Sequence, residues 1–370
     1  MQATSILIKP VSSACNIDCR YCFYKKLVKN RETADFGRMT EETAEQLVKN
    51  AVSYAEDFVA FAFQGGEPTL AGLPFFEHFV ELEQKYNTKN LEIQNTIQTN
   101  GTLIDEKWAQ FLHDNHFLVG LSLDGGKSVN DFCRVDAKGE STFARLMETV
   151  ELLDRYQVDY NIVSVVTAKS VEKLHFLYNF FKKKHFMYLQ FIPCMDESPE
   201  QKNPYSLTPE AYGKFLCELF DLWYEDFSHG FSIDIRMFSN LAQMAAGFPP
   251  EECGMCGHCS TYFVVESNGN VYPCDFYAVD EWKLGTVKED FQALYDSRLS
   301  QKFMGMSAPV HEKCRSCRHF DLCRGGCRRW REPVREGEAA LNVLCPAYEM
   351  FFDHCMERIF LLGDYIKSRM

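Results

Sequence analysis

The sequence lacks any long apolar segment. No run of 18 apolar residues occurs among the 370, so no segment predicts a membrane-spanning helix. The N-terminus, MQATSILIKP, also lacks the charged region and long apolar region of a secretory signal. These absences predict a cytoplasmic protein, in a compartment where disulfides are rare.

Positive charge is in deficit. Lys and Arg number 39 against 52 Asp and Glu, which gives a formal net charge of −13. The deficit argues against a nucleic acid or an anionic membrane as partner, because either would attract a basic face. A basic peptide remains compatible with this charge.

Cysteine, in contrast, is abundant and clustered, with 16 residues in the chain. Disulfides do not account for such clustering in a reducing compartment, whereas thiolate ligands to metal ions or iron–sulfur clusters do. Twelve of the cysteines form three groups: Cys15, Cys19 and Cys22; Cys253, Cys256, Cys259 and Cys274; and Cys314, Cys317, Cys323, Cys327 and Cys345. We interpret Cys133, Cys194, Cys217 and Cys355 as ordinary buried residues.

The first 235 residues alternate short apolar strands with amphipathic helices, which predicts an α/β domain with a parallel sheet. Six strand–helix units are too few for a closed eight-stranded barrel, so we expect an open partial barrel with its site at the carboxyl ends of the strands. The expected strands are residues 5–9, 59–63, 91–97, 118–123, 160–166 and 187–192; the expected helices are 41–56, 74–86, 105–113, 142–156, 171–184 and 209–225.

A second domain is predicted from residue 236 to 370. Helical periodicity weakens there, glycine, proline and cysteine increase, and metal clusters would replace missing apolar packing. Residues 261–274 predict a β-hairpin with Asn268 and Gly269 as its two turn residues. Residues 347–367 predict a closing helix.

The motif Cys15-x3-Cys19-x2-Cys22 directly follows the first expected strand. Three thiolates on a four-iron cluster leave one iron open to bind a small molecule. Spacing alone leaves a zinc site open as the alternative, with His113 or His116 as its fourth ligand.

With Phe23 and Tyr24 behind it, this motif resembles the signature of the radical S-adenosylmethionine (SAM) superfamily. Further motifs of that family follow in order at the strand ends: Gln64-Gly65-Gly66-Glu67-Pro68, Thr99-Asn100-Gly101 and Leu121-Ser122-Leu123-Asp124-Gly125. The resemblance implies that Gly65, Gly66 and Glu67 hold the amino group of SAM. It also implies that Ser122 and Arg134 hold the SAM carboxylate, and that Tyr21 and Met195 contact adenine. The alternatives are a surface ion pair for Arg134 and plain core packing for Met195.

The later cysteines match the SPASM extension of the same superfamily. The pattern is Cys259-x9-Gly269-x4-Cys274, then Cys314-x2-Cys317-x5-Cys323-x3-Cys327, then Cys345, and either Cys253 or Cys256 supplies an eighth ligand. Eight thiolates complete two four-iron clusters without an open iron. The family's pairing implies one cluster on Cys253, Cys259, Cys274 and Cys327, and another on Cys314, Cys317, Cys323 and Cys345. Zinc ribbons are the alternative. The implied fold is a partial (β/α)6 barrel followed by a SPASM domain with a hairpin and a C-terminal helix.

Within the superfamily, the chain resembles anaerobic sulfatase-maturating enzymes, through its first cysteine motif, Phe-Gln-Gly-Gly-Glu-Pro-Thr and Tyr-Pro-Cys-Asp-Phe-Tyr. The resemblance implies oxidation of a Cys or Ser in a Cys/Ser-x-Pro-x-Arg motif to Cα-formylglycine by a 5′-deoxyadenosyl radical. SAM and three 4Fe-4S clusters are the implied cofactors. An unfolded or nascent sulfatase polypeptide is the implied partner, with an electron donor such as ferredoxin or flavodoxin.

The same resemblance implies that Asp275, next to Cys274, is the catalytic base, whereas a lone Asp after Cys would otherwise be a solvated turn residue. Tyr24, Gln64 and Gln98 are expected to line the peptide site. A SPASM-type maturase that forms thioether cross-links is the alternative enzyme, although only 14 residues precede Cys15, too few for a leader-recognition domain. A zinc-binding interaction module is the alternative outside enzymes.

Overall fold

The computed structural model describes residues 4–195, 203–332, 334–335 and 338–369. The chain divides into two compact units, and each is described here by itself. The first unit contains Met1–Ser122, Cys133–Asn161 and Ser260–Phe303; the second contains Leu123–Phe132, Ile162–Cys259 and Met304–Met370.

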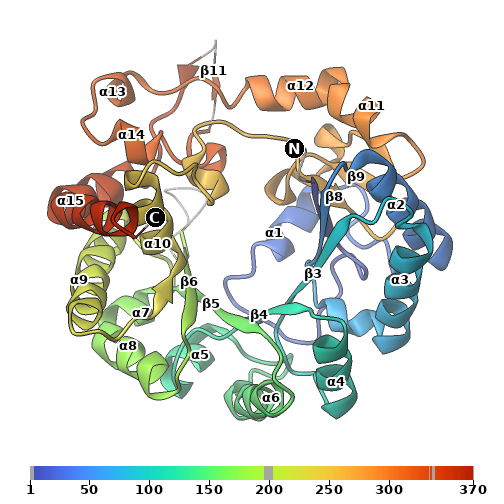
Figure 1. Ribbon diagram of the computed structural model, residues 1–370, viewed down its shortest axis with the longest axis horizontal. Helices are drawn as coiled ribbons and strands as arrows, with labels where there is room; N and C mark the ends of the chain where they lie inside the picture. Colours follow the sequence, from blue (N-terminus) through green and yellow to red (C-terminus); the bar gives the residue numbers. More distant parts are fainter. Residues whose placement is uncertain (1–3, 196–202, 333, 336–337, 370) are drawn as a thin grey trace. The chain divides into compact units, whose positions relative to one another are not determined.

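The first unit is built on a sheet with the strand order β10-β9-β8-β1-β2-β3-β4 (Figure 1). Strands β1 to β4 are parallel to one another, and β8 pairs with β1, also in parallel. Ile6 of β1 lies opposite Phe61 of β2 on one side and Phe263 of β8 on the other. The strands are β1 (Thr4–Ile8), β2 (Phe58–Phe63), β3 (Glu92–Thr99), β4 (Leu118–Ser122), β8 (Phe263–Val265), β9 (Asn270–Tyr272) and β10 (Gly285–Thr286).

Alternation along β2 creates the core of this unit. Every second residue of the sequence FVAFAF is buried, and Phe61 and Phe63 pack with Phe76 and Phe79 of helix α3. Figure 1 shows α3 and α4 on the outer side of the strands, so the loops at the strand ends stay free for a site. The helices are α1 (Tyr24–Leu27), α2 (Glu41–Tyr54), α3 (Leu73–Tyr86), α4 (Glu106–Asp114), α6 (Phe143–Arg155) and α11 (Phe291–Asp296), with α12 (Arg298–Gly305) at the boundary.

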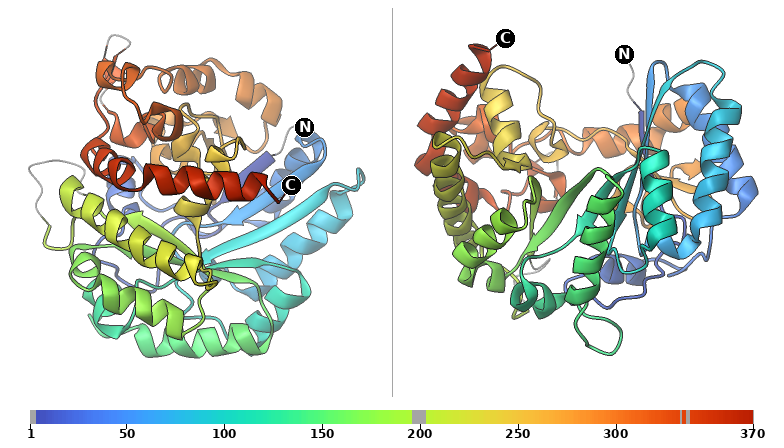
Figure 2. Two further views of the ribbon diagram at one scale, coloured as in Figure 1. Left: turned by 60° about the vertical axis from the view of Figure 1, so that its left-hand side comes forward. Right: turned by 60° about the horizontal axis from the view of Figure 1, so that its bottom comes forward.

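The second unit combines three parallel strands in the order β5-β6-β7 with a group of packed helices. The long C-terminal helix α15, red in Figure 1 and Figure 2, lies against α9 and α10. Phe351 of α15 packs there on Phe220 and Phe238. The elements are β5 (Tyr160–Val166), β6 (Tyr188–Pro193), β7 (Asp234–Ile235), β11 (Val334–Arg335), β12 (Glu338–Ala339), α5 (Lys127–Cys133), α7 (Ala168–Glu172), α8 (Leu174–Lys183), α9 (Pro209–Ser228), α10 (Arg236–Ala245), α13 (Glu312–Arg315), α14 (Phe320–Cys323) and α15 (Cys345–Lys367).

All six strands expected from the sequence are present, each within two residues at either end. The single helix expected over 171–184 is wrong, because Lys173 leaves the helical conformation between α7 and α8. The hairpin is confirmed as β8 and β9, but its connection is longer than the two residues predicted: it takes residues 266–269 and ends at Gly269 with φ +84°. Helix α10 was missed, although Phe238, Leu241 and Met244 recur at helical spacing. None of the described helices is long and apolar enough to cross a membrane.

Candidate functional site

The carboxyl ends of β1 to β4 bring the sequence motifs of the first unit together. The cysteine loop follows β1, the turn 64–67 follows β2, Asn100 and Gly101 follow β3, and Ser122 ends β4. Because neighbouring parallel strands end at the same edge, these segments form one site, as in other α/β sheets.

The cysteine loop is held by backbone contacts to the segment that carries Arg134. The amide of Asp18 donates to the carbonyl of Val135 (2.8 Å), and the amide of Arg20 donates to that of Cys133 (3.0 Å). Desolvation raises the pKa of the Cys15 thiol, and the nearby Glu67 and Cys22 raise it further. A neighbouring iron ion would offset the cost of deprotonating the Cys15 thiol, since thiolates are the form that binds metal.

The turn after β2 packs directly onto the cysteine loop. Gly66 has φ +56°, and a Cβ at this position would lie 2.2 Å from the carbonyl oxygen of Ala14. The next amide, of Glu67, donates to that same oxygen (2.8 Å). Glycine is therefore required at position 66 both for conformation and for space.

We expect Gly66→Ala to lower the free energy of unfolding by about 1–3 kcal/mol, because it adds left-handed strain to a steric clash. It should also weaken SAM binding, since the cysteine loop must move. Gly139→Ala is the matched control, because Gly139 has φ +80° but a Cβ added there would meet no atom within 4 Å. Thermal unfolding and SAM titration of both variants provide the measurement. Equal losses in the two would show that packing on Ala14 contributes nothing.

Glu67 is fully buried and connects two of the site's loops. Its carboxylate accepts hydrogen bonds from the Thr69 hydroxyl (2.6 Å), the Thr99 hydroxyl (2.6 Å) and the Asn100 amide (2.7 Å). Burial raises the pKa of Glu67, while these hydrogen bonds act in the opposite direction. The structure thus shows Glu67 as a link between the ends of β2 and β3. Thr99 and Asn100, to which no role was assigned from the sequence, take part in this link.

The residues expected to hold the SAM carboxylate lie in polar contacts. The Gln98 amide donates to the Ser122 hydroxyl (2.8 Å), and the Arg134 guanidinium donates to the Tyr21 hydroxyl (3.0 Å). Arg134 is only 6% exposed, so the alternative of a surface ion pair is wrong. Arg134 is therefore hydrogen-bonded to Tyr21, the residue expected to contact the adenine of SAM.

Asp275 lies in a hydrogen-bonded network with two of the expected substrate residues. Its carboxylate accepts from the Tyr24 hydroxyl (2.5 Å) and contacts the Lys9 ammonium (2.8 Å), and the Gln64 amide donates to the Tyr24 hydroxyl (2.9 Å). The Asp275 side chain is 12% exposed, so it is not a solvated turn residue. Burial and the Asp275 carboxylate raise the pKa of Tyr24 well above its ordinary value, so Tyr24 keeps its proton and donates.

Behind Asp275 lies a buried ion network that the sequence pattern does not reveal. Lys9 also faces Glu266 (3.6 Å), and Arg31 pairs with Glu266 (2.7 Å). All three side chains are at most 2% exposed. The signal in the sequence is a charged residue ending an apolar strand, Ser-Ile-Leu-Ile-Lys, which periodicity alone assigns to solvent.

Several of the later cysteines lie near one another in the second unit. Cys327 lies close enough to Cys259 for its charge to raise the pKa of the Cys259 thiol. Cys323 is within reach of Cys314, Cys317 and Cys345, and desolvation raises its pKa to about 11. Cys274 belongs to the first unit and Met195, which bridges to Leu207 after β6, to the second.

Cys256 has different neighbours. Its thiol contacts the carbonyl of Glu252, and the charge near it is Arg324. A Cβ added at Gly254, the residue after Cys253, would lie 3.8 Å from Cys327. Of the four cysteines outside the motifs, Cys133, Cys194 and Cys355 are buried as expected, whereas Cys217 is half-buried.

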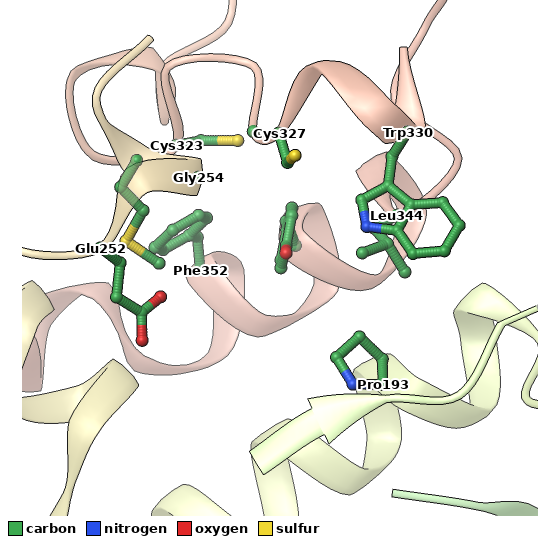
Figure 3. A pocket seen from close by; sticks show the side chains of 11 residues that line it. Pro193, Glu252, Gly254, Cys323, Cys327, Trp330, Leu344 and Phe352 are labelled. Carbon is green, nitrogen blue, oxygen red and sulfur yellow. The ribbon is translucent and has the colours of Figure 1, made fainter. Parts of the chain in front are cut away.

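A hollow of about 480 Å³, part of it open to solvent, is lined by two of the cysteines, Cys323 and Cys327. In Figure 3 Cys323 and Cys327 lie on one side of it and Pro193 on the opposite side. Within the described parts of the chain, no three His, Cys, Asp or Glu side chains are close enough to hold a single metal ion, and this includes His113 and His116.

Two family models match the chain. The model of the radical SAM superfamily matches residues 10–173, and that of an iron-sulfur cluster-binding domain, SPASM, matches residues 253–318. These ranges contain the first cysteine motif and most of the later cysteines.

Characterised relatives match over the whole chain. A cysteine-type anaerobic sulfatase-maturating enzyme of Clostridium perfringens is 46% identical, over 99% of this chain and 100% of the relative. A serine-type enzyme of Bacteroides thetaiotaomicron is 30% identical, over 94% and 88% respectively. These similarities do not favour the thioether maturase or the zinc module.

The solved structures agree. The structure described as native anSMEcpe with bound AdoMet and Cp18Cys peptide superimposes with a TM-score of 0.94 and 45% identity, over 99% of this chain and 100% of that one. Streptococcus suis SuiB shares the fold, with a TM-score of 0.65 at 18% identity. The chain thus belongs to the anaerobic sulfatase-maturating enzymes of the radical SAM superfamily.

Proposed function

We propose that this enzyme oxidises a cysteine in a Cys-x-Pro-x-Arg motif of a target sulfatase to Cα-formylglycine. The observation that carries the proposal is the Asp275 carboxylate, adjacent to Cys274 and hydrogen-bonded by the Tyr24 hydroxyl (2.5 Å). A proton acceptor at Asp275, next to the proposed cluster ligand Cys274, supports the proposal, because the oxidation removes a proton and an electron from one substrate.

The cofactors of this family fit the residues present. Cys15, Cys19 and Cys22 would hold the first cluster, with SAM against Gly65, Gly66, Ser122, Arg134, Tyr21 and Met195, and Glu67 would support the turn from behind. When bound, this pair supplies the 5′-deoxyadenosyl radical that removes a hydrogen atom from Cβ of the target residue. The tight packing of Gly66 on Ala14 supports this assignment, because it brings the turn's backbone to the cysteine loop.

The protein's own residues complete the oxidation. Asp275 accepts the thiol proton, while Tyr24 and Gln64 hold Asp275 and the target side chain in place. Cys253, Cys259, Cys274 and Cys327 would hold one auxiliary cluster, which would supply an acceptor for the remaining electron, and Cys314, Cys317, Cys323 and Cys345 would hold the other. We prefer Cys253 to Cys256 because a Cβ added at Gly254, the residue after Cys253, would lie only 3.8 Å from Cys327. The thioaldehyde product then hydrolyses to the aldehyde.

Cysteine is the preferred target because the cysteine-type relatives are 44–46% identical to this chain, against 30% for the serine-type relatives. A solved relative with 45% identity binds a peptide named Cp18Cys. The net charge of −13 suits a peptide that contains arginine.

We further propose the biological setting from these same features. The substrate is an unfolded or nascent sulfatase, because the target side chain must reach Asp275. Ferredoxin or flavodoxin supplies electrons in the cytoplasm, where thiols stay reduced. Residues 1–235 form the radical SAM domain and 236–370 the SPASM domain.

The test is an anaerobic reaction of the reconstituted enzyme, SAM and a reductant with three peptides. These carry Cys-x-Pro-x-Arg, Ser-x-Pro-x-Arg or Ala-x-Pro-x-Arg. We expect the cysteine peptide to lose its sulfur and gain an aldehyde faster than the serine peptide reacts, and the alanine peptide to stay unchanged. Mass spectrometry and aldehyde labelling provide the measurement.

Two outcomes would contradict the proposal. A cysteine peptide that loses hydrogen but retains its sulfur would indicate cross-linking chemistry instead. A serine peptide that reacts faster would reverse the proposed preference.

A further inference from the structure

Lys9 is the buried charge that the proposed mechanism does not use. It follows β1, and its amide donates to the carbonyl of Val265 in β8 (2.9 Å). Its side chain is 2% exposed, so it cannot itself meet a substrate. A buried lysine is costly unless it is paired, so its partners indicate its purpose.

Three contacts fix the Lys9 side chain. Its ammonium lies 2.8 Å from Asp275 and 4.7 Å from the centre of the Tyr24 ring. Its methylene stem runs beneath Gly65, where a Cβ would lie 2.7 Å from Cγ of Lys9. One side chain therefore touches the proposed base, a residue of the proposed peptide site and the proposed SAM turn.

The other members of the network show which carboxylate Lys9 serves. Arg31 lies 2.7 Å from Glu266 and already supplies that carboxylate with a close cation, whereas Lys9 is 3.6 Å from it. Lys9 is closer to Asp275. The Oδ1 atom of Asp275 contacts the Lys9 ammonium, and its Oδ2 atom accepts the hydrogen bond from Tyr24. Two contacts from different elements fix the plane of the carboxylate.

We propose that Lys9 is the positioning residue of Asp275: it holds the carboxylate in the orientation that accepts the substrate proton. This inference rests on the proposed function, because it assigns Asp275 as the base. Of the four charged side chains in the network, only Asp275 is appreciably exposed, at 12% against at most 2%. Lys9 thus acts through Asp275 and not on the substrate.

The test uses Lys9→Met, because methionine preserves an unbranched stem beneath Gly65 and removes the ammonium group. SAM cleavage should continue, while formylglycine formation should fall by on the order of 10-fold or more, since small misplacement of a catalytic group has effects of this size. The ratio of 5′-deoxyadenosine to formylglycine therefore rises. Iron content and a crystal structure of the variant show whether only the Asp275 side chain has moved.

The matched control is Arg31→Met, which removes the other cation of the same network without touching Asp275. It should lose stability but keep the wild-type product ratio. If both variants show the same raised ratio, the network is merely structural and the proposal is wrong. If Lys9→Met does not fold, Lys9→Gln, which can still donate a hydrogen bond, should show a smaller rise; a wild-type ratio in Lys9→Gln would overturn the proposal.

A double-mutant cycle separates this inference from the proposed function. In an Asp275→Asn background, Lys9→Met should cause no further loss of product, because its effect passes through Asp275. Additive losses would overturn the positioning role and leave Asp275 as the base. Wild-type product from Asp275→Asn alone would instead overturn the base assignment.

Discussion

Replacing Cys15, Cys19 and Cys22 together with alanine should remove about a third of the iron and abolish SAM cleavage. Three clusters of four irons give about twelve irons per chain, and this variant loses one cluster. The auxiliary cysteines lie outside the first loop, so their clusters should remain. Iron and sulfide analysis of anaerobically reconstituted protein, with chromatography for 5′-deoxyadenosine, provides the measurement.

The control for this experiment replaces Cys194, Cys217 and Cys355 with alanine. These cysteines lie outside all three motifs, so iron content and SAM cleavage should match the wild type. In the first variant the remaining clusters should also be spectroscopically insensitive to SAM and to peptide, because eight thiolates leave no open iron. A full iron load after loss of Cys15, Cys19 and Cys22 would refute the assignment of the first site.

Asp275→Asn should separate the two activities of the enzyme. Asparagine preserves the size of the side chain but cannot accept the substrate proton. SAM cleavage should survive, because the cysteine loop and its contacts to the segment 133–135 do not involve Asp275. Formylglycine should fall by on the order of 10²-fold or more, as loss of general-base catalysis predicts.

Cluster content must accompany that measurement, because Asp275 adjoins Cys274. The matched control is Asp280→Asn. The Asp280 carboxylate accepts a hydrogen bond from the backbone amide of Glu32 (2.7 Å) in an exposed contact. This variant should keep both activities and the full iron load. Wild-type formylglycine from Asp275→Asn with all clusters present would show that another group, or a bound water, is the base.

The strands and most helices follow from the sequence because alternation and helical periodicity report burial directly. In β2 the apolar run FVAFAF indicates the strand, and the structure shows that its second, fourth and sixth residues are the buried ones. Lys173 shows the limit: an apolar helical pattern continues from 171 to 184, but the backbone turns there and divides α7 from α8. Nothing in a periodic pattern records such a break.

The site likewise has features that the sequence predicts and features that it does not. Cysteine spacing is a strong signal because clusters demand several thiolates at fixed intervals. The contacts that join Lys9, Arg31, Glu266 and Asp275 cannot be predicted from the sequence. These residues are far apart along the chain, and each residue type alone is typical of a surface. Only the pairing of β8 with β1 brings them together.

The pairing of β8 with β1 also sets the order in which parts of the enzyme form during synthesis. Tyr24 and Asp275 are separated by 251 residues, and the hairpin of β8 and β9 that leads to Asp275 extends a sheet begun by β1. At 5–20 residues per second, a ribosome takes on the order of tens of seconds to make that stretch. Until then the edge of β1 that β8 will cover lacks its partner strand, and the cysteine loop exists without Asp275, its proposed proton acceptor. The radical-generating half of the enzyme is thus made first, and the half that uses the radical productively is made last.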